Sequence, residues 1–159
     1  MDGDDTAVDR AEVDALIRAL PGVMPKDAWG ETSYFYNPGG LFERGTYFAT
    51  IKDRDGANDR ASRLDRPGSW RLNMGVSKGR YLERFGPPPP RPGKGGVVEG
   101  PWDFEARDAL TPHPVYGWMS WVAVLCPSPA TWADCLPLLD DAHARARAGF
   151  EKRARSARR

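Results

Sequence analysis

An amphipathic helix is indicated near the start of the chain, between Thr6 and Gly22. Its apolar positions are Val13, Leu16, Ile17 and Leu20. Their i, i+3, i+4, i+7 spacing places them on one face of a helix. Thr6 is expected to cap the helix, and the Pro-Gly pair at 21–22 is expected to end it.

A second long helix is predicted over residues 127–153. Its apolar stripe consists of Trp132, Leu136, Leu139, Ala146 and Phe150. Ser128 is a favoured N-cap residue, and Pro129 suits the first turn, where a missing N–H costs nothing. Pro137 lies inside this segment, and we expect it to kink the helix or to split it in two.

Four strands are predicted between these helices, at about residues 29–37, 45–53, 69–77 and 116–125. In the third strand, every second residue from Trp70 to Val76 is apolar, and the residues between them, such as Arg71 and Asn73, are mostly polar. One face of this strand is therefore expected to be buried and the other to be polar. The fourth is apolar on both faces, which is typical of a central strand covered on each side. A short helix over residues 80–85, capped by Ser77, is also expected.

These elements predict an α+β fold, in which a small antiparallel sheet of about four strands is packed by N- and C-terminal helices. With 159 residues, the chain is expected to form a single domain over residues 1–159. Residues 87–101 are rich in proline and glycine, which predicts a flexible, exposed loop. Residues 154–159 are expected to form a basic tail.

The charge of the chain is balanced, with 23 Lys and Arg against 22 Asp and Glu. A net charge of +1 gives no general reason to expect binding to nucleic acid or to an anionic membrane. The chain has no signal peptide pattern and no run of about 18 apolar residues, so no membrane partner is expected. Together with only two cysteines, these features predict a cytoplasmic protein.

No metal ion or cofactor is predicted. His113, Cys126, Cys135 and His143 do not follow a zinc-binding spacing. The cysteines are interpreted as small buried residues, and His143 as a core histidine with one hydrogen bond. The glycine-rich run at 93–100 lacks the Gly-Lys-Ser/Thr ending of a phosphate-binding loop.

One group of polar residues suggests a candidate site. Its members are His113 and Tyr116 as a general acid or base, and Arg63, Asp65, Arg66, Arg71, Asn73 and Trp118 as ligand-binding residues. A structural interpretation stays open beside this one: Asp65 would pair with an arginine to hold its loop, and His113 would order the turn between its two flanking prolines. The pattern does not decide whether the protein is an enzyme.

Four segments carry a resemblance to a known family: "FATIKDRD", "SRLDRPGSWRLNMGV", "PHPVYGWMSWVAVLCPSPATW" and the Ala/Arg-rich last helix. Over about residues 7–153 the chain resembles the bacterial domain-of-unknown-function 6194 family. More loosely, its order of elements is similar to the MmcQ/YjbR-like fold, which has a double-wing shape. The resemblance implies a fold and a single domain, and it assigns no catalytic residue.

Two functional hypotheses follow. The first is a small-molecule-binding or metabolic domain with a pocket around His113 and the "RLDRPG" loop, and the near-zero net charge favours it. The alternative is a nucleic-acid-binding or regulatory module, which the double-wing likeness favours. The sequence indicates neither the ligand nor the oligomeric state.

Overall fold

The computed structural model describes residues 6–158, so the acidic residues at positions 2, 4 and 5 and the basic residue at 159 lie outside the described part. Six strands form one antiparallel sheet in the order β1-β2-β3-β4-β6-β5. The strands are β1 (Val23–Ala28), β2 (Glu31–Tyr36), β3 (Thr46–Lys52), β4 (Arg71–Gly75), β5 (Leu110–Pro112) and β6 (Trp121–Leu125). The helices are α1 (Arg10–Arg18), α2 (Lys78–Phe85) and α3 (Pro129–Ala157), with short 3-10 turns η2 (Pro38–Gly40) and η3 (Gly117–Met119).

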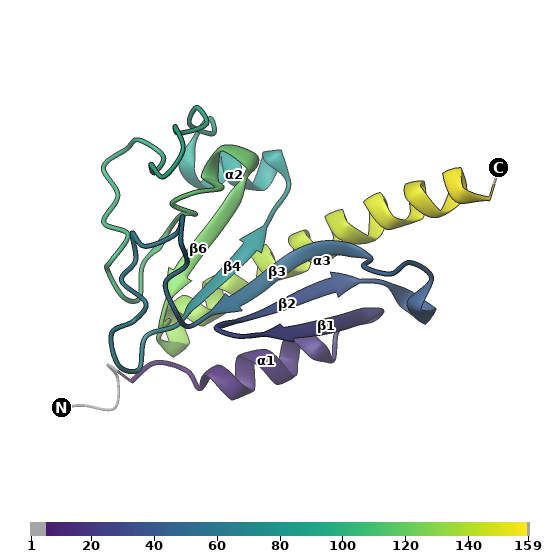
Figure 1. Cartoon of the computed structure of the whole chain (residues 1–159), viewed down its shortest axis with the longest axis horizontal. Helices are drawn as coiled ribbons and strands as arrows, with labels where there is room; N and C mark the ends of the chain where they lie inside the picture. Colours follow the sequence, from purple (N-terminus) through teal and green to yellow (C-terminus); the bar gives the residue numbers. More distant parts are fainter. Residues whose placement is uncertain (1–5, 159) are drawn as a thin grey trace.

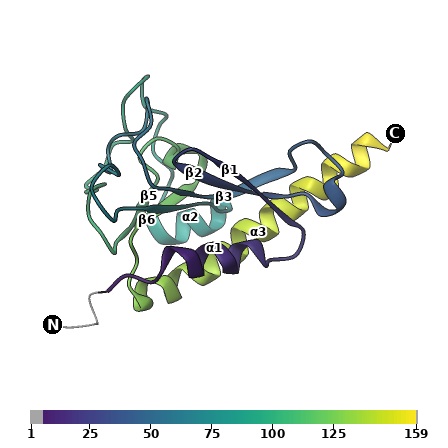
Figure 2. The ribbon, with the colours of Figure 1, turned by 60° about the horizontal axis from the view of Figure 1, so that its bottom comes forward.

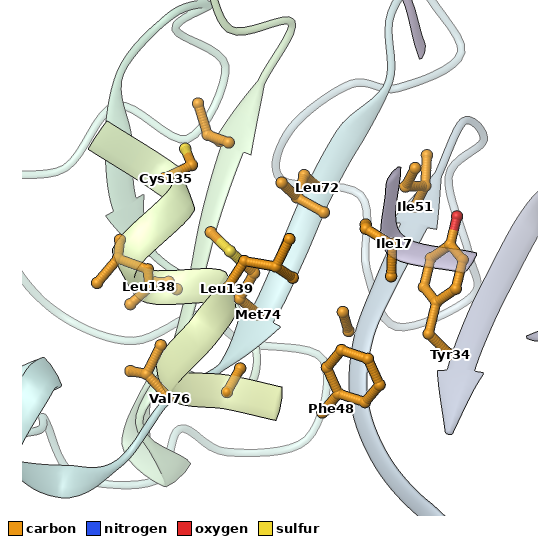
Figure 3. Packing of buried hydrophobic residues seen from close by; sticks show 14 of the residues in the cluster. Ile17, Tyr34, Phe48, Ile51, Leu72, Met74, Val76, Cys135, Leu138 and Leu139 are labelled. Carbon is orange, nitrogen blue, oxygen red and sulfur yellow. The ribbon is translucent and has the colours of Figure 1, made fainter. Parts of the chain in front are cut away.

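The three α-helices lie on one side of the sheet, and long loops cover part of the other side (Figures 1 and 2). Between the helices and the sheet lies the apolar core, which includes Ile17 of α1, Leu72 of β4 and Leu139 of α3 (Figure 3). All three side chains are fully buried. The predicted α+β architecture is therefore confirmed. None of the helices in residues 6–158 is long and apolar enough to cross a lipid bilayer.

The prediction of about four strands was too low by two. The four predicted strands correspond to β2, β3, β4 and β6, and β1 and β5 were missed. Strand β1 is an edge strand that contains Pro25 and exposes all but its first residue, so it has no alternation of buried and exposed positions. Strand β5 is three residues long, which is too short to produce a periodic pattern.

Two details of the helices also differ from the prediction. The N-cap of α1 is Asp9, whose carboxylate accepts a hydrogen bond from the Ala11 N–H, and not Thr6. Helix α3 continues through Pro137 as one helix and is not split. It also includes residues 154–157, the first part of the predicted basic tail. Ser77 and Ser128 cap α2 and α3, as predicted.

Loops cover part of the face of the sheet opposite the helices (Figures 1 and 2). Strand β4 is buried at every position, so Arg71 and Asn73 on its polar face are as inaccessible as Leu72 on its apolar face. The Pro/Gly-rich segment 87–101 contains no helix or strand and exposes most of its residues. Val98 is its buried anchor, and the Val98 N–H donates to the carbonyl of Pro114 over 2.8 Å.

Candidate functional site

A cavity of about 400 Å³ lies between the loop-covered face of the sheet and the loops themselves. We call it the inner cavity. It is lined by Glu31, Tyr47, Thr50, Lys52, Gly56, Asn58, Asp59, Asn73, His113, Val115, Tyr116, Met119 and Trp121. This lining combines a polar floor, contributed by β3 and β4, with aromatic walls.

A fully buried arginine supports the floor of the inner cavity from behind. The Arg71 guanidinium pairs with both carboxylate oxygens of Asp59. It also donates to the Ser62 hydroxyl over 2.9 Å and to the Asn73 side-chain oxygen over 2.7 Å. Such a bidentate, hydrogen-bonded pair is how a protein accommodates a buried charge. Arg71 therefore organises the floor and does not line the cavity itself.

The hydrogen bonds continue along the floor from Arg71 through Asn73 to Thr50. Asn73 accepts from Arg71 through its side-chain oxygen, so its amide nitrogen is the donor to the Thr50 hydroxyl, 2.8 Å away. Residues 50 and 73 are register partners on β3 and β4, which holds their side chains side by side. Because the Thr50 oxygen accepts from Asn73, the Thr50 hydroxyl acts as a donor, and the Tyr47 hydroxyl is a neighbouring acceptor for it.

Asp59 is ionised in this network. Burial by itself would raise the pKa of Asp59, but the hydrogen bonds and positive charge of Arg71 more than offset it and hold that pKa below its usual value. Asp59 therefore neutralises Arg71, and this ion pair brings no net charge to the inner cavity.

His113 is buried with its ring directed at its own turn. Its Nδ1 accepts hydrogen bonds from the backbone N–H groups of Val115 and Tyr116, at 3.0 and 3.1 Å. We therefore assign the proton of the neutral ring to Nε2. This nitrogen lies 3.9 Å from a carboxylate oxygen of Asp59 and 3.3 Å from an Arg71 guanidinium nitrogen, which is a donor and does not pair with it. Burial, together with the positive charge of Arg71, lowers the pKa of His113 to about 3. His113 is thus neutral near pH 7.

A glycine allows one aromatic wall to lie close to the sheet. A Cβ atom at Gly75 would lie 2.6 Å from the Trp121 ring, so only glycine permits this ring position. The Trp121 ring in turn packs on the Tyr47 ring, with the centroids 4.9 Å apart. A bulge in the pairing of β2 with β3, between Tyr34 and Phe35, shifts the register next to Tyr47.

Lys52 supplies a positive charge whose ion pair, with Glu31, is long. Its side chain is only 15% exposed, and the nearest carboxylate oxygen, on Glu31, is 4.0 Å from Nζ. That separation is too long for a hydrogen bond. Lys52 lines the inner cavity, and within residues 6–158 its ammonium group makes no hydrogen bond.

The residues proposed from the sequence are only partly brought together. Asn73, His113 and Tyr116 line the inner cavity, and Arg71 lies directly behind it. Trp118 lies outside it, beneath the Arg91 guanidinium at 4.9 Å from the ring centroid. Arg63, Asp65 and Arg66 do not line the inner cavity either.

The "RLDRPG" segment holds the loops together. Arg66 donates to the carbonyls of Ser62, Arg63 and Glu105. Asp65 accepts from the backbone N–H of Asp55 over 3.0 Å, so its partner is a backbone amide and not the arginine that the structural interpretation expected. These contacts connect two loops that are about forty residues apart in the sequence.

Sequence reasoning missed five important residues of the cavity: Glu31, Tyr47, Thr50, Lys52 and Asp59. A signal existed for two of them, because Thr50 and Lys52 alternate with the buried Ala49 and Ile51 of β3. No local signal existed for Asp59, which lies in a polar loop without periodicity. Among the described residues, no three His, Cys, Asp or Glu side chains gather into a metal-binding group.

Comparison with known sequences identifies one family. The sequence model of the Family of unknown function (DUF6194) matches residues 8–155. No curated protein and no solved structure matches the chain.

Proposed function

The chain belongs to the Family of unknown function (DUF6194), and we propose that its function is to bind a small polar organic molecule in the inner cavity. The volume of about 400 Å³ is within the range of small-molecule sites in proteins. The lining has the usual composition of such sites, with aromatic walls and a few fixed polar groups. The main support is the Lys52 ammonium group, which is largely buried, has only a long ion pair with Glu31 and makes no hydrogen bond within residues 6–158.

Lys52 is suited to anchor a ligand because its ammonium group is poorly solvated and has three hydrogens to donate. Burying such a group is costly unless it finds a partner. A carbonyl, hydroxyl or carboxylate oxygen of a ligand would provide one. Glu31, on the same side of the cavity, would accept from an N–H or O–H group of that ligand.

The floor would recognise a polar edge of the ligand. The Thr50 hydroxyl, whose oxygen accepts from the Asn73 amide, would donate its hydrogen to the ligand instead of to the Tyr47 hydroxyl. The rings of Tyr47 and Trp121 provide an apolar wall for a planar part of the ligand. A planar molecule with hydrogen-bonding groups at its edge is therefore the best match to this lining.

We assign binding and not a reaction to this site. In the neutral tautomer of His113, the basic nitrogen Nδ1 accepts from two backbone amides, so it is not free to take a proton from a ligand. Tyr116 is 49% exposed and lies at the rim. Any catalytic role of these two residues stays a hypothesis.

The proposal can be tested by a thermal-shift screen of polar metabolites. We expect some compounds to raise the melting temperature of the wild-type protein, because a ligand that binds only the folded state stabilises it. The Lys52→Met variant should bind these compounds about tenfold or more weakly, the cost of losing a charged hydrogen bond. Lys26→Met, on the exposed strand β1, is the matched control and should bind normally. Equal affinities for wild type and Lys52→Met would contradict the proposal.

A second candidate function, nucleic-acid binding, has one supporting observation beside the sequence likeness to the MmcQ/YjbR-like fold. The C-terminal half of α3 extends past the strands (Figure 1) and has several basic side chains. They include Arg147, Lys152 and Arg155. Since Arg147 is already paired with Glu151, we rank this function second.

A further inference from the structure

A second cavity, of about 370 Å³, adjoins the inner one. We call it the outer cavity. Asn58, Val115 and Tyr116 line both cavities, so the two spaces lie next to each other. A ligand that fills the inner cavity and extends past Tyr116 would enter the outer cavity.

The two cavities differ in charge. The described residues that line the outer cavity include two cations, Arg91 and Lys94, and no carboxylate. The inner cavity, by contrast, contains Glu31 and Asp59 as well as Lys52. No ion pair of Arg91 or Lys94 with another described residue is present, and the Arg91 guanidinium instead stacks over the Trp118 ring. The outer cavity is therefore the more cationic of two adjoining spaces.

The loop that carries these cations has a defined conformation next to the sheet. The Gly96 N–H donates to the Gly93 carbonyl over 2.9 Å and closes a turn around Lys94. Gly95 has a φ of +77°, in the left-handed region that favours glycine. Two residues beyond the turn, the Val98 N–H bonds to Pro114 of the "PHP" segment. The cations are thus attached to the same segment that positions His113.

We propose that the natural ligand has an anionic group, a phosphate or a carboxylate, that binds Arg91 and Lys94 while its polar head occupies the inner cavity. This inference rests on the proposed function of the inner cavity. An arginine fork and a lysine ammonium are the side chains that most often bind such anions. Tyr116 lies between the two subsites and contacts the ligand where head and anion join.

The test compares three probes that share one ring: phenol, phenyl phosphate and phenylacetate. Their affinities are measured by NMR titration of the amide resonances of Thr50 and Asn73 in the inner cavity and of the Gly93–Gly96 turn. The wild-type protein is compared with the double variant Arg91→Gln/Lys94→Gln. The double variant Arg44→Gln/Lys26→Gln, which removes one arginine and one lysine from exposed positions elsewhere, is the matched control.

We expect at least one anionic probe to bind about tenfold or more tightly than phenol and to shift both sets of resonances, given the strength of hydrogen bonds to charged groups. This preference should disappear in Arg91→Gln/Lys94→Gln, with phenol affinity unchanged, and persist in the control. A preference that survives in Arg91→Gln/Lys94→Gln, or equal binding of phenol and both anions, overturns the inference and leaves the inner-cavity proposal standing. If no probe shifts Thr50 or Asn73, both proposals are contradicted.

Discussion

At the scale of single residues, the surroundings of His113 keep its buried ring in the neutral form. The ring contacts Arg71 on one side and two backbone amides on the other. Both surroundings disfavour a second proton, and the pKa of about 3 reflects burial first and Arg71 second. The residue is therefore held in its neutral form over the whole physiological range.

This predicts a specific pH dependence of folding stability. The pKa of His113 is about 3 in the folded state and near 6.5 in the unfolded chain, so between these values the unfolded state binds more protons. Stability should be fully present above pH 6.5 and decrease as the pH falls toward 3, by up to ~1.4 kcal/mol per pH unit from this residue. Asp59, with its lowered pKa, adds a further loss as the pH falls below about 4.

Urea unfolding of the wild type and of His113→Asn at pH 7, 6, 5 and 4 checks this prediction. Asparagine keeps a side-chain acceptor for the turn but does not titrate. The free energy of unfolding of His113→Asn should therefore depend less steeply on pH above pH 4 than that of the wild type. His143→Asn is the matched histidine control. An identical pH profile for His113→Asn and wild type would show that His113 is not the source of the effect.

How far the sequence predicted the site depends on where each residue lies. Asn73, His113 and Tyr116 were identified because they flank or belong to recognisable strands. Asp59 was not, because its role arises from a contact with Arg71, twelve residues away, that only the folded loop creates. Arg71 was predicted as a ligand-binding residue, since a polar strand face suggests access. In the structure, loops cover that face, and the guanidinium is bound by protein groups.

At the scale of elements, helix α3 shows that tertiary packing can override a local signal. Pro137 removes one helical hydrogen bond and should break the helix if local preference alone decided. The residues around it, however, are anchored: Cys135, Leu138 and Leu139 are buried in the core. This packing keeps the helix continuous. The same argument explains the missed strands β1 and β5, whose pairing with β2 and β6 compensates for weak local patterns.

Replacing Pro137 should therefore stabilise the protein. Pro137 is exposed, so Pro137→Ala loses little packing and restores an N–H donor within α3. We expect an increase in the free energy of unfolding of about 1–3 kcal/mol, measured by urea denaturation. Pro137→Gly should gain about 1 kcal/mol less, because glycine has a lower helix propensity. A loss of stability in Pro137→Ala would mean that α3 requires the proline for its path.

At the scale of the whole molecule, charge distribution separates the two candidate functions. The net charge is +1, and the basic residues of α3 are balanced by acidic residues elsewhere on the chain. Nucleic-acid binding depends mainly on neutralising phosphates, and it weakens steeply with salt. We therefore expect no submicromolar binding to random duplex DNA in a gel-shift assay at physiological salt. Tight binding that weakens with added salt would instead make the second candidate function the first.

We propose that the inner cavity binds a small polar molecule. The most direct measurement is a map of amide and indole NMR shifts on titration of the compound that stabilises the protein most in the screen. We predict that the largest shifts occur at Thr50, Lys52 and Asn73 and at the Trp121 indole, all of which line the inner cavity. Shifts confined to another part of the surface, such as the cleft between Trp29 and Arg66, would contradict the claim.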